Sequence, residues 1–240
     1  MTGAARLAAM SARRLGAGLV TIASPPESFA IYAAEEPGTL VKAVADGAAF
    51  GELLKDKRKN AVLVGPGAGV SATTAERVLA ALGAGKATVI DADGLSAFEG
   101  NPKRLFAAIT GSCLLTPHEG EFMRLFAVQG DKPSRARAAA RAAGAAVLLK
   151  GADTVIAAPD GRAVINASGT PDLATAGSGD VLAGMALGLM AQGMAAFDAG
   201  CVAAWLHGRL AERLGPGLIA EDLPGEIPGL LRELGQIGGQ

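Results

Sequence analysis

Short aliphatic runs, each followed by a glycine-rich or polar turn, recur through the middle of the chain. Residues 61–64 (Ala-Val-Leu-Val) lead into Gly-Pro-Gly-Ala-Gly, and residues 87–90 (Ala-Thr-Val-Ile) lead into Asp-Ala-Asp-Gly. Residues 113–115 precede Thr-Pro-His, and residues 146–150 precede Gly-Ala-Asp-Thr. Uninterrupted apolar runs of this length are typical of strands buried on both faces. The pattern therefore predicts a buried strand at each of these places.

Helical periodicity occupies the segments between and before these runs. Apolar residues recur at helix spacing in residues 71–82 and 135–143, and residues 2–14 form an amphipathic helix with its arginines on a polar face. A short helical region is expected after residue 94. Residues 27–59 show no clear pattern.

The remaining elements are expected after the first helix and towards the end of the chain. Residues 19–22 (Leu-Val-Thr-Ile) have the composition of a strand. Residues 154–158 and 163–166 flank Pro-Asp-Gly and predict a β-hairpin. From Gly179 onward we expect helices, and we interpret the uncharged stretch 181–197 as one buried helix, shorter than the roughly 20 residues that cross a bilayer.

Strands that alternate with helices predict an α/β fold, in which a mostly parallel sheet is covered by helices on both faces. Right-handed crossovers place the carboxyl ends of parallel strands at one edge, where ligands bind in open α/β sheets. We therefore expect distant turns to converge there: residues 65–69, 91–94, 116–121, 150–154 and 176–180. No linker or repeat interrupts residues 1–240, which predicts a single domain.

Composition narrows the possible functions. The 240 residues are 50% hydrophobic, include 34 glycines but only 4% aromatic residues, and carry a formal net charge of -1. These values exclude a disordered tail, a basic nucleic-acid binder and a small disulfide scaffold. We expect no nucleic-acid partner and no membrane partner.

Cysteine and histidine are too few and too scattered for a structural zinc site. Cys113 and Cys201 belong to no Cys-x-x-Cys pair, and the histidines are His118 and His207. Buried, reduced cysteines favour a cytoplasmic location. The arginine pair at residues 13–14 has a superficial likeness to a twin-arginine export signal, but a helix followed by a strand is the preferred interpretation. We expect His207 to be packed and hydrogen-bonded.

The strongest candidate site is the turn at residues 174–180, Ala-Thr-Ala-Gly-Ser-Gly-Asp, which opens a long apolar helix. Glycines allow the amides of a helix N-terminus to approach an anion, and the helix dipole favours negative charge there. Asp180 could take a proton from a substrate hydroxyl while these amides stabilise phosphoryl charge. The alternative is that Asp180 only caps the helix. The chain has no P-loop, no Gly-x-Gly-x-x-Gly opening a helix and no Gly-x-Ser-x-Gly.

Charged side chains at other strand ends are further candidates. Lys150 ends a predicted buried strand, where a lysine is unusual. A phosphate bound to its ammonium would explain this position, although the side chain could instead extend to solvent. Glu119 and Glu121 follow His118, and a carboxylate there could hold Mg²⁺ through water or cap the next helix. Asp93 lies where a helix N-cap is expected.

Six segments occur together and in order: residues 1–5 (Met-Thr-Gly-Ala-Ala), 65–69 (Gly-Pro-Gly-Ala-Gly), 91–95 (Asp-Ala-Asp-Gly-Leu), 115–122 (Leu-Thr-Pro-His-Glu-Gly-Glu-Phe), 149–151 with 154–156, and 177–184 (Gly-Ser-Gly-Asp-Val-Leu-Ala-Gly). In these segments the chain resembles the ADP- or ATP-dependent NAD(P)H-hydrate dehydratases, a branch of the ribokinase-like superfamily. The resemblance covers nearly the whole chain and implies a three-layer α/β/α ribokinase-like fold.

The resemblance also implies an activity. Enzymes of this family are lyases that convert the S form of NAD(P)H hydrate back to NAD(P)H and consume ADP or ATP. Hydroxide is a poor leaving group, so phosphorylation of the ring hydroxyl creates a better one, and elimination of phosphate restores the dihydronicotinamide. The family also implies Mg²⁺, a homotetramer and a functional link to an NAD(P)H-hydrate epimerase.

Residue roles follow from the matching positions of the family. Asp180 would be the base, with anion-hole amides from Gly177 and Gly179. The hydrated dinucleotide would contact Ala4, Gly67, His118 and Asp180. The AMP part of the nucleotide would contact Lys150, Gly151, Ala152, Asp153, Thr154 and Gly179, and Glu121 would organise Mg²⁺.

The chain departs from the family pattern at several positions. Glu119 stands where the family usually has proline, and residues 176–178 (Ala-Gly-Ser) replace the commoner Gly-Gly-Thr. The family begins with a strand before the Met-Thr-Gly-Ala segment, so we expect that this chain lacks that first strand. Two other functions stay open: a ribokinase-like kinase for hydroxymethylpyrimidine or a thiazole alcohol, and an inactive nucleotide-binding relative. The sequence does not separate ADP from ATP or NADH hydrate from NADPH hydrate.

Overall fold

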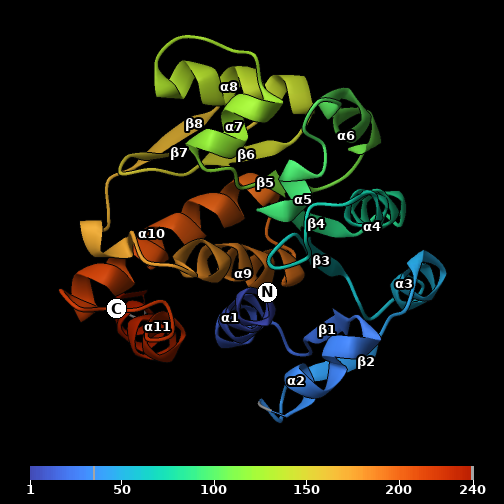
Figure 1. Cartoon of the computed structure of the whole chain (residues 1–240). Helices are drawn as coiled ribbons and strands as arrows, with labels where there is room; N and C mark the ends of the chain where they lie inside the picture. Colours follow the sequence, from blue (N-terminus) through green and yellow to red (C-terminus); the bar gives the residue numbers. More distant parts are fainter. Residues whose placement is uncertain (35, 239–240) are drawn as a thin grey trace.

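The computed structural model describes residues 1–34 and 36–238, and its centre is a six-stranded sheet in the order β3-β4-β5-β6-β7-β8 (Figure 1). Neighbouring strands are parallel from β3 to β6, whereas β7 is antiparallel to both of its neighbours. The strands are β3 (Ala61–Val64), β4 (Ala87–Ile90), β5 (Cys113–Leu115), β6 (Ala146–Leu149), β7 (Thr154–Ala157) and β8 (Ala163–Asn166). The predicted strands and hairpin are therefore confirmed.

Helices cover both faces of this sheet (Figure 1). One layer contains α4 (Ala72–Gly83), α5 (Asp93–Ser96), α6 (Pro102–Ala108), α7 (Glu119–Leu125) and α8 (Lys132–Ala143). The other contains α1 (Thr2–Arg14), α9 (Ser178–Ala191), α10 (Ala196–Leu214) and α11 (Leu223–Gly238). Successive side chains of a strand point to opposite faces, so Leu114 joins the core under α9 and α10 while Leu115 joins the core under α4, α7 and α8. This is the three-layer α/β/α fold that the sequence predicts.

Helix α1 crosses α9 at very short range. A Cβ atom on Gly184 would lie 2.2 Å from the carbonyl oxygen of Ala8, and one on Gly188 would lie 2.8 Å from that of Ala12. Glycine at both positions of α9 therefore permits the backbones to touch. These two contacts fix α1 against the middle and the later part of α9.

A second, two-stranded parallel sheet lies beside the main body (Figure 1). It consists of β1 (Thr21–Ser24) and β2 (Leu40–Ala43), with the short helices η1 (Pro26–Ser28), α2 (Phe29–Ala33) and α3 (Gly47–Leu54) nearby in sequence. The prediction of a strand at residues 19–22 is corrected by two residues, and its only pairing within the described chain is with β2. The segment without a clear pattern holds several elements too short to show periodicity.

The prediction of one helix over residues 181–197 is wrong. Helix α9 ends at Ala191, and α10 begins at Ala196 after a turn in which Gly193 has φ +92°. The turn is marked by Gln192-Gly193, because a residue in the left-handed region favours glycine. Helix α8 begins at Lys132, before the predicted residue 135, since the Asp131 carboxylate accepts a bond from the Ser134 amide. None of the described helices is long and apolar enough to cross a membrane.

Candidate active site

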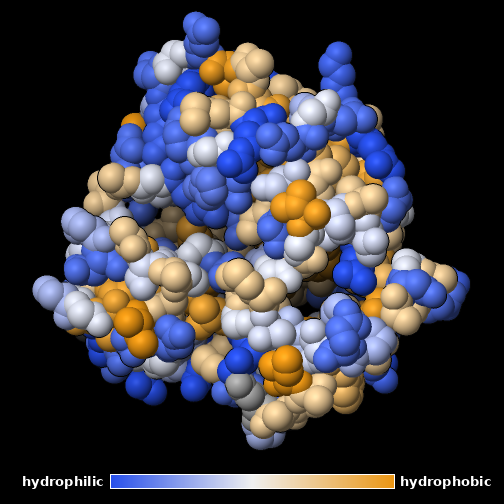
Figure 2. All heavy atoms as spheres, viewed as in Figure 1, coloured by the Kyte–Doolittle hydropathy of each residue, from blue (hydrophilic) through white to orange (hydrophobic). Residues whose placement is uncertain are grey.

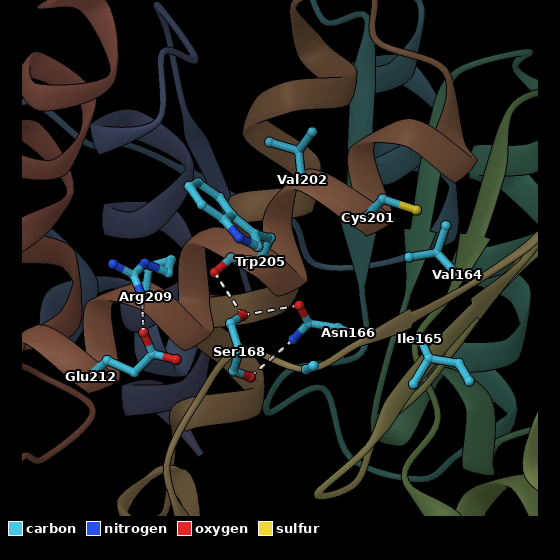
Figure 3. A pocket seen from close by; sticks show the side chains of 10 residues that line it. Val164, Ile165, Asn166, Ser168, Cys201, Val202, Trp205, Arg209 and Glu212 are labelled. Atoms are coloured by element: carbon cyan, nitrogen blue, oxygen red, sulfur yellow. Dashed lines mark hydrogen bonds and ion pairs between the residues drawn. The ribbon is translucent and has the colours of Figure 1, made fainter. Parts of the chain in front are cut away.

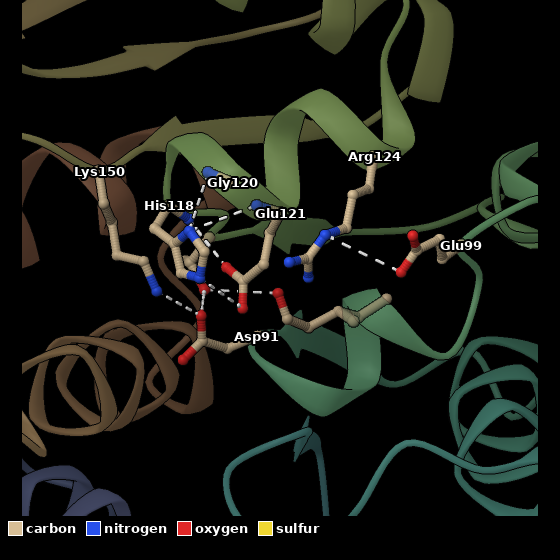
Figure 4. A network of polar contacts seen from close by, with 9 residues as sticks. Asp91, Glu99, His118, Gly120, Glu121, Arg124 and Lys150 are labelled. Atoms are coloured by element: carbon tan, nitrogen blue, oxygen red, sulfur yellow. Dashed lines mark hydrogen bonds and ion pairs between the residues drawn. The ribbon is translucent and has the colours of Figure 1, made fainter.

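The turns at the strand ends converge as expected. A Cβ on Gly65 would lie 1.7 Å from the carbonyl oxygen of Asp91, so the turns after β3 and β4 are in contact. The amide of Lys150 donates to the carbonyl oxygen of Pro117 at 2.9 Å, which joins the turns after β5 and β6. Figure 4 shows Asp91, His118, Glu121 and Lys150 gathered at this edge from different segments.

Asp93 has a different role from the expected helix cap. Ala92 is the residue before α5, and Asp93 is the first residue of that helix. The Asp93 carboxylate accepts a hydrogen bond of 2.8 Å from the Gly69 amide, 24 residues away in sequence. Asp93 therefore ties the glycine turn after β3 to the turn after β4.

Asp91 lies at the centre of a buried network. It is 1% exposed, and its Oδ1 accepts a bond of 2.7 Å from Lys150 Nζ and one of 2.9 Å from Thr116 Oγ1. The ammonium group of Lys150 also lies beside the start of α9, because a Cβ on Gly179 would be 3.4 Å from Lys150 Nζ. The alternative in which Lys150 extends to solvent is wrong, since only 18% of its side chain is exposed.

Lys150 is surrounded by carboxylates that keep it charged. Burial by itself disfavours the ammonium, but the negative charges of Asp91, Glu121 and Asp180 outweigh it and raise the pKa of Lys150 above its usual value. A fixed cation beside a helix N-terminus is suited to holding a phosphate group.

Asp180 is the third residue of α9, and it is not the N-cap. Gly177 occupies the cap position with φ +91°, and a Cβ there would lie 2.5 Å from Leu7 Cδ1, so glycine is required for both conformation and space. Among the described residues the Asp180 carboxylate has no hydrogen bond or ion pair. Burial and the charges of Asp91 and Asp93 outweigh the opposite effect of Lys150 and raise the pKa of Asp180 to about 6. These properties suit a general base.

The turn of α9 is supported from behind by His207. Ser178 and His207 are both buried, and Ser178 Oγ lies 3.2 Å from His207 Nε2. Burial lowers the pKa of His207 to about 4, so the ring is neutral near pH 7. The packed, hydrogen-bonded role expected for His207 is confirmed.

His118 and Glu121 form a capping box at the start of α7. His118 Nδ1 accepts from the amides of Gly120 and Glu121 at 3.0 and 3.3 Å, and Glu121 Oε2 accepts from the His118 amide at 2.8 Å. Glu121 is 6% exposed, whereas Glu119 pairs with Arg135. The capping alternative thus holds for Glu121.

The remaining candidate residues lie around this centre. Gly67 has φ +68° and lies against the start of α1, where a Cβ on it would be 3.5 Å from the Ala4 Cβ and 2.0 Å from the Met1 carbonyl oxygen. Residues 151–154 follow Lys150, and Asp153 pairs with Lys132 at 2.8 Å. Asp91, Thr116 and Ser178 lie in turns that were expected to converge, but no role was assigned to them, because their contacts join segments that are distant in sequence.

A separate cavity of about 550 Å³ lies between β8 and α10 (Figure 3). It is lined by residues such as Ile165, Cys201 and Trp205, and none of the candidate residues lines it. Its charged side chains Arg209 and Glu212 already pair with each other. Figure 2 shows hydrophobic side chains scattered in small groups on the face viewed there. The candidate catalytic and binding residues therefore lie at the strand ends and outside this cavity.

The profile of the NAD(P)H-hydrate dehydratase family matches residues 1–223, and the chain belongs to this family. A solved ribokinase-like superfamily protein of Enterococcus faecalis shares the fold, with a TM-score of 0.83 at 22% sequence identity.

Two relatives show how similar the sequence is to individual proteins of the family. The chain is 38% identical over 253 residues to the bifunctional NAD(P)H-hydrate repair enzyme Nnr of Salinibacter ruber, covering 96% of this chain and 46% of that protein. It is 37% identical over 245 residues to the ADP-dependent (S)-NAD(P)H-hydrate dehydratase of Neisseria meningitidis, covering 95% and 78%. The chain thus spans about half the length of the bifunctional relatives that it matches.

A solved structure is also similar. The ADP/ATP-dependent NAD(P)H-hydrate dehydratase of Bacillus subtilis, co-crystallised with ATP and Mg²⁺, superposes with a TM-score of 0.84 at 28% identity. The match covers 97% of this chain and 85% of that one. The fold and the family expected from the sequence are confirmed.

Proposed function

We propose that this chain dehydrates the S form of hydrated NADH or NADPH at the expense of ADP or ATP. One observation carries the proposal. Asp180, a carboxylate with a pKa of about 6, lies in the first turn of a helix that begins with glycines, and the Lys150 ammonium lies beside the same turn. A base, an anion hole and a phosphate-binding cation thus lie together at the start of α9. Family membership supports the same activity.

The proposed reaction has two stages. Asp180 takes the proton of the ring hydroxyl, whose oxygen attacks the terminal phosphorus of the nucleotide, and AMP leaves from ADP or ADP leaves from ATP. The amides of Gly177 and Gly179 face the charge that develops on the phosphoryl oxygens. The ring C–O bond then breaks, phosphate leaves with the electron pair, and loss of a ring proton restores the carbon–carbon double bond. No oxidant or reductant is consumed.

Binding roles complete the proposal. Lys150 and residues 151–154 hold the AMP part of the nucleotide with Gly179. Ala4, Gly67 and His118 contact the hydrated dinucleotide. Their support is the contact of Gly67 with the start of α1, the position of Lys150 Nζ beside Gly179, and family membership over residues 1–223.

Mg²⁺ fits this site as a companion of the nucleotide. No group of three or more His, Cys, Asp or Glu side chains among the described residues could hold a metal ion alone. Glu121 uses Oε2 in its capping box, and its Oε1, which lies 3.5 Å from His118 Nε2, would contact the ion through water. When bound, Mg²⁺ supplies charge neutralisation on the phosphates. The ATP and Mg²⁺ of the Bacillus subtilis crystals support this assignment.

We further propose that residues 1–240 act as one domain of a cytoplasmic homo-oligomer, a tetramer by family likeness, with a functional link to an NAD(P)H-hydrate epimerase. The family match over residues 1–223 supports the single domain. Cys113 and Cys201 are free thiols, which supports a reducing compartment.

The test is incubation with hydrated NADH and ADP, then ATP, while the absorbance of regenerated dihydronicotinamide is followed. The expected result is recovery of NADH with one phosphate released per turnover. A stable phosphorylated product with hydroxymethylpyrimidine or a thiazole alcohol would support a kinase instead. Tight ADP binding without phosphate release would support an inactive nucleotide binder.

A further inference from the structure

Asp91 is a buried carboxylate that has no place in the proposed reaction. It directly follows β4 and is 1% exposed, so it is shielded from bulk solvent. Its Oδ1 receives two donors, Lys150 Nζ at 2.7 Å and Thr116 Oγ1 at 2.9 Å. We propose that Asp91 is a positioning residue, which fixes the Lys150 ammonium at the start of α9 where that group meets the phosphates of the bound nucleotide.

The geometry explains why Lys150 needs such a partner. Lysine carries a point charge on a flexible four-carbon stem, so its direction must come from its neighbours. Asp91 and Lys150 are 59 residues apart in sequence, and their bond crosses from the end of β4 to the end of β6. Because Gly179 lies beside Lys150 Nζ, this bond holds the charge at the helix N-terminus.

Thr116 holds Asp91 in turn. Thr116 is 1% exposed and lies at the end of β5, between the strands that carry Asp91 and Lys150. Its hydroxyl and the ammonium share one carboxylate oxygen, which fixes the orientation of the carboxylate. Removing either partner of a buried charge pair leaves the other without compensation. Lys150 would then turn towards Glu121 or Asp180, whose charges also act on it.

The experiment compares Asp91→Asn with Thr116→Val, Thr116→Ser and the matched control Asp160→Asn, which alters an exposed aspartate at the β7–β8 turn. ADP binding is measured by calorimetry, and kcat/KM for hydrated NADH is measured across pH. We expect Asp91→Asn to weaken ADP binding about tenfold and Thr116→Val about threefold, because the first removes the charge that holds Lys150 and the second removes only one hydrogen bond that orients this charge. Thr116→Ser and Asp160→Asn should bind ADP as the wild type does.

The pH profile separates positioning from loss of structure. Asp91 and Asp93 raise the pKa of Asp180, Lys150 lowers it, and burial raises it. Asp91→Asn should therefore move the acid limb of kcat/KM to lower pH, whereas Thr116→Val should leave the limb in place. Unchanged ADP affinity and an unchanged limb in Asp91→Asn would overturn the inference.

The inference rests on the proposed function only in taking the anion to be a nucleotide phosphate. A wild type that binds ADP without turnover would refute the dehydratase, while the affinities would still decide the role of Asp91. A wild type that binds no ADP would overturn both. If Asp91→Asn does not fold, the Thr116→Val and Thr116→Ser pair decides, and equal ADP affinity in those two variants would refute the inference.

Discussion

Asp180 has a raised pKa at a place where a helix usually lowers it. The positive end of a helix dipole stabilises a carboxylate, and Asp180 lies in the first turn of α9. Burial, helped by Asp91 and Asp93, nevertheless raises its pKa to about 6. A carboxylate whose pKa stays near 6 despite the helix dipole is suited to accepting a proton near neutral pH.

Asp180→Asn is expected to lower turnover by about 10² to 10⁴ while ADP affinity changes little, because a base acts mainly in the transition state. Steady-state kinetics and calorimetry measure the two effects. Turnover like that of the wild type would remove Asp180 from the mechanism.

The rate of the wild type should depend on pH through the same group. The base is active when deprotonated, so kcat/KM should fall below about pH 6, approaching tenfold per pH unit. The measurement is a kcat/KM profile from pH 4.5 to about 8, a range chosen to bracket this pKa. A flat profile down to pH 5 would show that Asp180 titrates elsewhere or does not act as the base.

Lys150→Ala is expected to weaken nucleotide binding by roughly 1 to 3 kcal/mol, the scale of a lost charge-assisted contact. The loss should have the same sign for ADP and ATP, as measured by calorimetry. Lys55→Ala is a matched control, since that side chain is 72% exposed on the surface. Equal affinities for both variants would assign Lys150 to a purely structural pair with Asp91.

At this scale the sequence indicates which residues have unusual positions but not what they contact. Lys150 and Asp180 stand out because each follows a recognisable local pattern. The sequence left the capping of α7 by Glu121 as an open alternative. It gave no sign of the hydrogen bond that the Gly69 amide donates to the Asp93 carboxylate. Hydrogen bonds between segments depend on the completed sheet, so no local pattern could reveal them.

The crossing of α1 and α9 depends on individual glycines. Gly184→Ala places a Cβ 2.2 Å from a backbone oxygen of α1, so the helices must separate. We expect a loss of about 1–3 kcal/mol in the free energy of unfolding, although alanine favours a helix. Gly51→Ala in α3 is the control, because no atom lies within 4 Å of its added Cβ, and it should stabilise by about 0.5–1 kcal/mol. Urea denaturation measures both, and a more stable Gly184→Ala would contradict the close contact.

Elements were predictable where one pattern dominates. The strands β3 to β6 are short, mainly apolar runs followed by polar or glycine-rich turns, and β4, β5 and β6 are buried over nearly their whole length. Strand β1 was predicted two residues too early, and β2 was missed because it is mostly exposed and therefore shows no buried apolar run. The turn between α9 and α10 was missed because apolar residues continue on both sides of it.

The burial of Asp180 should lower the free energy of unfolding of the whole molecule at neutral pH. Its pKa rises from 3.8 to about 6 on folding, so the folded state holds a proton more tightly and loses stability as pH rises through this interval. Asp180→Asn should therefore be more stable than the wild type at pH 7 by about 1 kcal/mol, a value kept low because the carboxylate is only partly buried.

Denaturant unfolding of both proteins at pH 7 and pH 4 tests this cost. The difference should nearly vanish at the lower pH, where Asp180 is protonated in the folded state and increasingly so in the unfolded chain. An equal difference at both values would show that the substitution acts through packing and not through charge.

The sheet also separates residues that are adjacent in the chain. Leu114 belongs to the same core cluster as Met185, whereas Leu115 belongs to the cluster of Phe122 on the other side of the sheet. A volume change at Leu115 can be compensated only by partners on its own side of the sheet. Over evolutionary time, core substitutions in this protein should therefore accumulate as two separately co-varying sets, in which consecutive residues of one strand belong to different sets.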